Sequence, residues 1–382
     1  MLYRVAAIGG LLLAAMIGTA AQAASPATKG VPVHDQSAIA GRGYFYIGGS
    51  YVGDPGKRLM HGQIYVEVLT PRHPRQRYPL VLIHGAAQTA TNWMGTPDGR
   101  PGWADYFVGQ GYTVYMIDQP ARGRSPWLPE IDGKLATFSA EAIESRFTAP
   151  QDFNLWPQAK LHTQWPGSGR IGDPVFDAFY ATQVPYVASA VETEQRNQQA
   201  VAALLDRIGP AIILTHSQSG PFGWLIADAR PKLVKAVVAV EPGGPPFQNE
   251  ILNNNKARAW GVTDIKIAYD PPVNDPSELK TEQQAEPDGP NLVRCIQQQA
   301  PARRLVNLAN IPVIVITTES SYHAAYDHCT AKYLAQAGVK VTDFQLGDHG
   351  IHGNAHMVML EKNNLQVASV ITTWLAHAVP SR

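Results

Sequence analysis

Short apolar runs rich in β-branched residues alternate along this chain with segments of helical periodicity. Polar residues are rare inside the runs, as expected for parallel strands that helices cover on both faces. The alternation predicts an α/β fold with a doubly wound, mostly parallel sheet. The runs lie at residues 78–83, 112–117, 211–214, 235–240 and 311–317, and the helical patterns lie at 103–110, 192–208, 223–228 and 364–378.

Two further strand-like segments precede the first of these runs and indicate an N-terminal hairpin. Residues 43–51 and 63–69 are alternating or rich in aromatic side chains, and a turn that contains Gly and Pro separates them. We predict one domain from residue 42 to residue 382, preceded by a flexible segment at 24–41.

The first 23 residues have the three parts of a secretory signal peptide. Arg4 supplies the positive start, an apolar stretch follows, and Ala21-Gln22-Ala23 ends it with small residues. The apolar stretch is short for a membrane anchor. We therefore expect export to the periplasm or the medium, with no stable membrane insertion after cleavage.

The segment Leu-Thr-His-Ser-Gln-Ser-Gly, which ends at Gly220, places a serine between a strand and a helix. This is the context of a nucleophile elbow, whose usual pattern is Gly-x-Ser-x-Gly because the sharp turn has room only for small side chains. Thr215 and Ser219 stand here where that pattern has glycine. We predict Ser217 as the nucleophile. Ser219 is the competing candidate, but it would lie inside the helix start; a serine that merely caps the helix is the structural alternative.

A serine nucleophile needs a base to take its proton and hydrogen-bond donors for the oxyanion that develops on the substrate. His84-Gly85-Ala86-Ala87 follows the third strand-like segment, where such donors are expected. We predict that the backbone N–H groups of Ala86 and Gln218 form the oxyanion hole.

Three histidines before the last helix compete for the role of base. His349, His352 and His356 share the segment Asp-His-Gly-Ile-His-Gly-Asn-Ala-His, and their spacing also allows a metal site. The base should be oriented by a buried carboxylate. Glu241 and Glu319 are the two candidates, because each follows an apolar strand-like run.

Two long stretches do not fit the alternation of strands and helices. Residues 127–189 and 244–309 are rich in Pro, Gly, Gln and Asn, and structureless loops of that length are unusual in compact domains. We expect these insertions to form a cap over the active site. Aromatic residues of the first stretch either line a pocket or pack the cap onto the core; they are Trp156, Trp165, Phe176, Phe179 and Tyr180.

These motifs resemble those of a subfamily of bacterial α/β-hydrolase esterases that includes the sulfonylurea herbicide de-esterification esterases. The resemblance extends over most of the chain beyond the signal peptide. It is carried by Phe-Tyr-Ile-Gly-Gly at 45–49, Thr-Pro-Asp-Gly-Arg-Pro-Gly at 96–102, Asp-Gln-Pro-Ala-Arg-Gly-Arg at 118–124, Glu-Pro at 241–242 and Gly-Asn-Ala-His at 353–356.

The resemblance implies the α/β-hydrolase fold and a catalytic triad of Ser217, His356 and Glu241. Most α/β-hydrolases carry the acid after the strand that precedes the final one, which corresponds to Glu319 in this chain. The subfamily instead carries a glutamate after the sixth strand, and the base is the histidine of Gly-Asn-x-His. The resemblance therefore overrides the general preference for Glu319.

The motifs and the resemblance together predict a serine esterase that hydrolyses a small-molecule ester through an acyl-enzyme, without a metal or organic cofactor. Lys plus Arg equals Asp plus Glu, at 31 each, so no net charge favours nucleic acid as a partner. A lactonase, amidase or acyltransferase would use the same triad, and a periplasmic binding protein could keep the fold without turnover. A homodimer is a further expectation that the sequence leaves open.

Cys295 and Cys329 are the two cysteines of the chain. In an oxidising compartment they are expected to pair and to tie together two loop-rich regions. Two separate buried thiols are the alternative, because spacing alone does not show whether the two Cα atoms come close enough.

Overall fold

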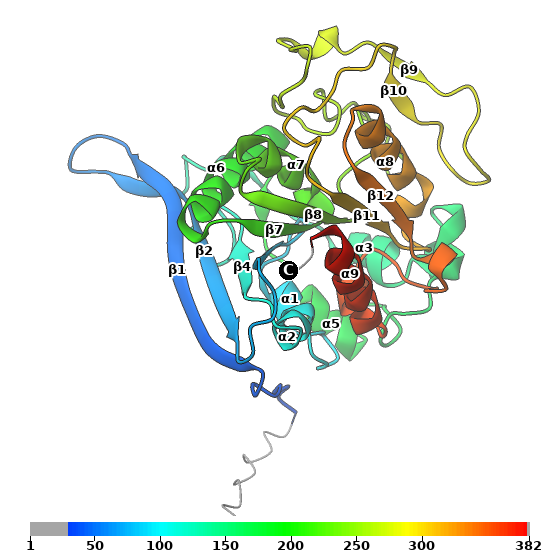
Figure 1. Ribbon diagram of the computed structural model, residues 1–382. Helices are drawn as coiled ribbons and strands as arrows, with labels where there is room; N and C mark the ends of the chain where they lie inside the picture. Colours follow the sequence, from blue (N-terminus) through cyan, green and yellow to red (C-terminus); the bar gives the residue numbers. More distant parts are fainter. Residues whose placement is uncertain (1–29, 380–382) are drawn as a thin grey trace, which may run out of the picture. The chain divides into compact units, whose positions relative to one another are not determined.

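The computed structural model describes residues 30–379, and every element named below lies in the unit that begins at His34. The strands of its main sheet are β1 (Ile39–Val52), β2 (Leu59–Pro71), β3 (Leu80–Ile83), β4 (Val114–Asp118), β7 (Ala211–His216), β8 (Val234–Val240), β11 (Val313–Thr317) and β12 (Val341–Gln345). Their order is β1-β2-β4-β3-β7-β8-β11-β12 (Figure 1). β1 and β2 form the antiparallel hairpin at one edge, and all pairs from β4 to β12 are parallel. The predicted α/β fold and its N-terminal hairpin are confirmed.

Helices cover both faces of this sheet (Figure 1). On one face, side chains of the central strands share a hydrophobic core with α6 (Ala190–Ile208), α7 (Gly220–Ala229) and α8 (Asp327–Gln336). On the other face, the alternate side chains share a second core with α2 (Trp103–Gly109) and α9 (Asn364–Ala378). Because both faces are covered, every residue of β3, β7 and β11 is buried, which explains the apolar runs that make up most of their length.

Sequence patterns did not reveal β12 and α8, for two physical reasons. β12 is an edge strand whose residues are only partly buried, so it has no continuous apolar run. α8 buries polar side chains, among them Asp327 and Thr330, and this weakens its hydrophobic periodicity. The positions of β12 and α8 are therefore determined by contacts with the rest of the fold.

The two stretches that interrupt the alternation contain short elements. The first holds β5 (Leu135–Ala136), α3 (Ala140–Ile143), η1 (Glu144–Thr148), α4 (Pro150–Phe153), η2 (Pro157–Leu161), α5 (Pro174–Tyr180) and β6 (Tyr186–Val187), and the second holds η4 (Pro276–Glu278), β9 (Thr281–Gln283) and β10 (Ile296–Gln298). Trp165, Phe176 and Phe179 are buried in the core that also contains α2 and α9. These aromatic residues therefore pack the first insertion onto the sheet.

The described residues begin beyond the predicted signal peptide, which lies outside them. β1 starts at Ile39, before the domain boundary predicted at residue 42. No helix among residues 30–379 combines the length and the apolar character that a membrane span requires.

Candidate active site

Ser217 stands at the carboxyl end of β7, where the chain turns through η3 (Ser217–Ser219) into α7. Its φ is +57°, and a left-handed conformation of this kind costs a non-glycine residue about 1–3 kcal/mol. The turn needs glycine at position 220, because a Cβ there would lie 2.4 Å from the Cβ of Pro242. The local structure is therefore the strained strand-turn-helix that the sequence predicted.

The hydroxyl of Ser219, the competing nucleophile, forms hydrogen bonds with backbone groups. Its Oγ accepts the N–H of His216 at 2.9 Å and lies 2.8 Å from the carbonyl oxygen of Ile83, to which it donates. The side chain is fully buried. These bonds explain why serine can replace the usual glycine at this position of the elbow, and they leave Ser217 as the serine with an accessible hydroxyl.

A continuous chain of hydrogen bonds links Ser217 to His356 and Glu241. The Ser217 Oγ lies 2.9 Å from His356 Nε2, and His356 Nδ1 lies 2.6 Å from Glu241 Oε2. Because Nδ1 faces a carboxylate, it carries the ring proton, and Nε2 is left to accept a proton from the serine. Glu241 has a φ of +44° and accepts two further bonds, from the N–H of Thr318 at 2.9 Å and from its hydroxyl.

The two titratable partners of Ser217 are both fully buried, yet their pKa values are held where a general base needs them. Burial alone would raise the pKa of Glu241, but the charge of His323, the hydrogen bond from His356 and the Thr318 hydroxyl lower it to about 2. Burial lowers the pKa of His356, and the neighbouring His323 adds to the effect, against the attraction of Glu241. At neutral pH the site therefore holds an anionic Glu241 beside a neutral imidazole.

The remaining candidates for base and acid lie elsewhere. The His349 ring stacks on Phe344 with centroids 3.9 Å apart. His352 Nδ1 lies 2.9 Å from Glu319 Oε1, while the other oxygen of Glu319 accepts the N–H of Gly353 at 2.8 Å. Glu319 thus anchors the loop that leads to His356 instead of binding its ring, and the three histidines do not converge on one point.

Several residues that sequence reasoning did not single out hold the His356 ring and backbone in place. His216 Nε2–H donates to the carbonyl oxygen of His356 at 2.9 Å. The rings of His323 and Phe147 stack on His356, with centroids 4.8 and 5.1 Å away. His216 has a sequence signal, since it directly precedes Ser217. Phe147 belongs to the first insertion, and no local pattern connects it to a loop more than two hundred residues later.

The predicted oxyanion-hole donors lie on either side of Ser217. Within the described part of the chain, the N–H groups of Ala86 and Gln218 donate to no protein acceptor. A Cβ at Gly85 would come within 3.0 Å of the Ser217 Cβ, so the loop after β3 approaches the elbow closely. The geometry leaves both N–H groups available to a ligand bound at Ser217.

Arg122 bridges the two segments that carry these donors, the loop after β3 and the elbow at Ser217. Its Nη1 donates to the Gly85 carbonyl oxygen at 3.0 Å, and the guanidinium also contacts Gln218 Oε1 at 3.2 and 3.3 Å. His84 Nδ1 contacts the same Gly85 oxygen at 2.9 Å. Since a trans peptide directs its C=O and N–H to opposite sides, these bonds orient the N–H of Ala86. Burial lowers the pKa of Arg122 to about 9, so it stays charged at neutral pH.

Replacing Arg122 with methionine is expected to lower kcat for an ester by about 10- to 100-fold, because one oxyanion-hole donor loses its orientation. KM should change by less than about threefold, since this donor acts mainly in the transition state. The matched control is Arg124→Lys, whose parent side chain pairs with Asp118 instead of the oxyanion loop. Steady-state kinetics separate the two parameters, and an R122M variant with wild-type kcat would contradict this role.

A cavity of about 220 Å³ opens at Ser217. Its walls come from the elbow, from the segment after β8 and from the turn after β11. The lining residues include Ser217, Gln218, Asn249, Asn253, Arg258, Tyr322 and His323. None of the five aromatic residues of the first insertion, for which the sequence left pocket lining and packing as alternatives, contributes to this wall.

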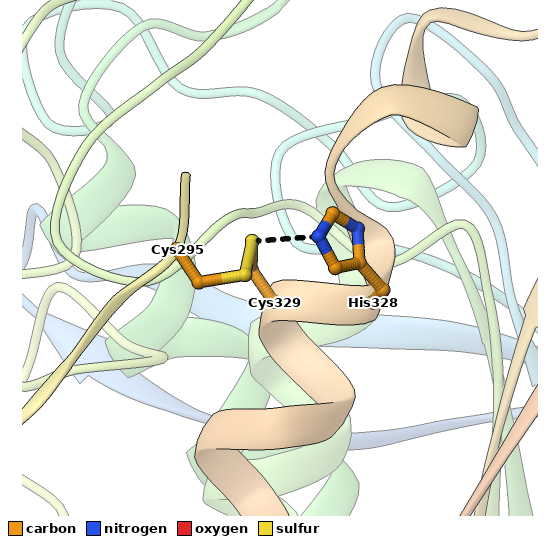
Figure 2. A group of neighbouring side chains, drawn as sticks. All are labelled: Cys295, His328 and Cys329. Atoms are coloured by element: carbon orange, nitrogen blue, oxygen red, sulfur yellow. Dashed lines mark hydrogen bonds between the residues drawn. A yellow bond between two sulfur atoms is a disulfide. The ribbon is translucent and has the colours of Figure 1, made fainter. Parts of the chain in front are cut away.

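The two cysteines are joined by a disulfide, with Cα atoms 5.1 Å apart (Figure 2). The bond ties Cys295, in the second insertion, to Cys329 on α8. The His328 ring points toward the bond, with Nε2 3.5 Å from Cys329 Sγ (Figure 2). Because both sulfur atoms are in the disulfide, neither is a thiolate able to bind a metal.

Comparison with known proteins places this site in a family. The model of the alpha/beta hydrolase family matches residues 80–370, which include the elbow and both of its hydrogen-bonded partners. The chain belongs to the alpha/beta hydrolase family. This α/β hydrolase is 50% identical over 333 residues to a fungal protein named "Probable secreted lipase phiG" (Fungal sp., strain ATCC 74256), covering 87% of this chain and 88% of the relative.

A solved structure gives the same fold. The α/β hydrolase described here matches the structure titled "The Atomic Resolution Structure of a Novel Bacterial Esterase" with a TM-score of 0.60 and 25% identity. The match covers 89% of this chain and 96% of the esterase. The family model and this structural match confirm the α/β-hydrolase fold that the sequence resemblance implied.

Proposed function

We propose that this α/β hydrolase is a serine carboxylic-ester hydrolase that forms its acyl-enzyme on Ser217. The observation that carries the proposal is the uninterrupted chain of hydrogen bonds from the Ser217 hydroxyl through His356 to Glu241. A half-identical relative is named a lipase, and the matching bacterial structure is an esterase. Both names describe ester hydrolysis, and they support the same reaction for this chain.

In the proposed mechanism, His356 Nε2 takes the hydroxyl proton as Ser217 Oγ attacks the ester carbonyl carbon. The N–H groups of Ala86 and Gln218 hold the negative oxygen of the tetrahedral intermediate. The C–O bond to the alcohol then breaks, and the imidazolium gives its proton to the departing oxygen. Water attacks the acyl-enzyme with the same base, releasing the acid. Glu241 fixes the ring orientation and stabilises the imidazolium throughout.

We infer a small polar ester as the substrate, because amide and charged side chains contribute to the wall of the cavity. The second insertion supplies Asn249, Asn253 and Arg258 to that wall, which supports the interpretation of the insertions as a cap that selects the substrate. Membership of the Ser-Glu-His esterase subfamily, and export by the N-terminal signal, are part of the same proposal, and the relative's name includes "secreted".

The test compares the hydrolysis of three compounds: p-nitrophenyl acetate, the corresponding p-nitroanilide, and a small lactone. We expect turnover of the ester at least about a hundredfold faster than that of the anilide, because the alcohol is the better leaving group. A protein that is folded but hydrolyses none of these esters would contradict the proposal. Faster turnover of the anilide or the lactone would instead identify an amidase or a lactonase.

The pH dependence follows from the shift on His356. The base must be neutral to accept the proton of Ser217, and its pKa lies below the ordinary 6.5. We therefore expect the acid limb of the kcat/KM profile to have its midpoint below pH 6.5, so that most of the activity is kept at neutral pH. Glu241, with a pKa of about 2, adds no step in this range. An acid limb centred above pH 7 would show that another group is the base.

A further inference from the structure

We infer that Arg258 binds a carboxylate of the substrate, so that the natural ester is an anionic one. The inference deepens the proposed function and rests on it, because it assigns a specificity-determining residue to the same cavity. Arg258 lies in the second insertion and is 7% exposed. It lines the cavity that opens at Ser217.

The hydrogen bonds of Arg258 fix its guanidinium and leave one end of it free. Nε donates to the carbonyl oxygen of Pro245 at 2.7 Å, and Nη2 donates to the Gln248 carbonyl oxygen and to Asn249 Oδ1, each at 2.8 Å. These bonds use three of the five N–H donors. Among the described residues no acceptor is found for Nη1, and this atom keeps access to solvent. Two donors on a positioned, planar group are therefore available to a ligand.

Arg258 is a buried cation without an ion-pair partner. Its guanidinium forms no salt bridge within 4.0 Å among the described residues, and all three of its acceptors are neutral. The two acids that attract it from farther away are Asp264, which accepts the Arg258 backbone N–H at 2.7 Å, and Glu194. Burial and the charge of Asp264 raise the pKa of Glu194 to about 8, so Glu194 is mostly protonated at neutral pH and offers little compensating charge.

A buried, unpaired arginine is costly, because desolvation of the charge is not repaid. Burial accordingly lowers the pKa of Arg258. An anion that enters the cavity would supply the missing partner. A carboxylate fits best, because its two oxygens match the fork of N–H donors on a guanidinium.

The charge of Arg258 reaches the catalytic groups. Burial lowers the pKa of His323, whose ring stacks on His356, and the charge of Arg258 adds to the effect. Arg258 and His323 line the same cavity as Ser217, so an ester bound at the serine brings its other groups close to the guanidinium. Arg258 is accordingly a binding residue, and it takes no part in proton transfer.

Glu250 is the acid that lines the same cavity, and it opposes the binding of an anion. It is partly exposed, and its Oε1 accepts a hydrogen bond from Gln248 Nε2 at 3.0 Å. Because Arg258 and Glu250 carry opposite charges, removing one or the other should change the selection for an anionic ester in opposite directions. Loss of the arginine should weaken selection for an anionic ester, and loss of the glutamate should strengthen it.

The experiment compares kcat/KM for two pairs of esters that differ in one carboxylate. In the first pair, monomethyl glutarate carries the carboxylate in its acyl part and methyl pentanoate is its neutral counterpart. In the second pair, O-acetylglycolate carries the carboxylate in its alcohol part and propyl acetate is its neutral counterpart. We expect the wild-type protein to prefer the anionic ester in one pair by on the order of 30-fold, the effect of hydrogen bonds to a charged group. The pair that shows the preference identifies the side of the ester that faces Arg258.

Arg258→Gln should reduce this anionic-to-neutral ratio by about the same 30-fold, and Glu250→Gln should raise it. Lys256→Gln is the matched control, because it removes an exposed cation two residues away, and the ratio should stay within about threefold. If R258Q does not fold, Arg258→Lys keeps the charge, loses the fork and should still lower the ratio.

A wild-type ratio near one in both pairs, or a ratio that R258Q leaves unchanged, would overturn the inference. The proposed function would survive that result, provided that hydrolysis of the neutral esters depends on Ser217. If no ester were hydrolysed in a Ser217-dependent way, the proposed function itself would fail. The two failures are therefore distinguishable in one set of assays.

Discussion

Replacing Ser217 with alanine is expected to lower kcat for ester hydrolysis by on the order of a million-fold, to the rate of the remaining binding and oxyanion-hole effects. The physical reason is the loss of the atom that forms the acyl bond. The hydrogen bond to His356 Nε2 disappears with it. The fold should be unaffected, since alanine keeps the Cβ and removes only the hydroxyl; kcat is measured by steady-state release of alcohol, and folding by circular dichroism.

The control for this variant is Ser219→Gly, which restores the usual residue of the elbow at that position. It removes the hydrogen bonds that Ser219 Oγ accepts from the His216 N–H and donates to the Ile83 carbonyl oxygen, so some loss of stability is expected, about 1 kcal/mol. Turnover should remain at least a thousandfold above that of the Ser217→Ala variant. If the two variants lost activity equally while both stayed folded, the assignment of the nucleophile would be open again.

Glu241→Gln is expected to lower kcat by about 10⁴-fold. A neutral amide in place of the carboxylate no longer holds the proton on His356 Nδ1, and it does not stabilise the imidazolium that forms when Ser217 attacks. Because Glu241 also accepts two hydrogen bonds from Thr318, the shape-conserving glutamine is a better choice than alanine. KM should change little, and the loss should appear in kcat.

The matched control is Glu319→Gln, at the position where most α/β hydrolases carry the acid. Its carboxylate contacts His352 and the Gly353 N–H, so the variant should keep kcat within about tenfold. The reverse pattern, a large loss in E319Q with near-normal E241Q, would mean that the acid had been assigned to the wrong strand.

Sequence patterns predicted the part of the fold in which burial dictates composition. β3, β7, β8 and β11 are almost wholly buried, so their apolar runs are visible without a structure. The hairpin of β1 and β2 was visible through its turn and its aromatic residues. The edge strand β12 and the polar-faced α8 were not, because their positions depend on tertiary contacts that leave no period in the sequence.

The residues of the candidate site likewise differ in how far sequence patterns alone predict them. Ser217, Ala86 and Gln218 follow from local rules, because each stands in a turn directly after a strand. The choice of Glu241 over Glu319 needed the resemblance, since both follow buried strands and only the three-dimensional structure shows which one His356 contacts. Arg122 belongs to the Asp-Gln-Pro-Ala-Arg-Gly-Arg motif at 118–124, but the sequence assigns it no role. Its role depends on a peptide oxygen 37 residues earlier in the chain, a relation that no local pattern expresses.

The central claim is that Ser217 carries the acyl group, and covalent labelling tests it most directly. The full chain is treated with a fluorophosphonate, digested, and analysed by mass spectrometry, alongside the same protein acid-quenched during turnover of a p-nitrophenyl ester. The account predicts one equivalent of phosphonyl adduct on Ser217, an acyl adduct on the same residue after the quench, and loss of ester hydrolysis in proportion to labelling. An adduct on another residue, or undiminished hydrolysis by fully labelled protein, would contradict it.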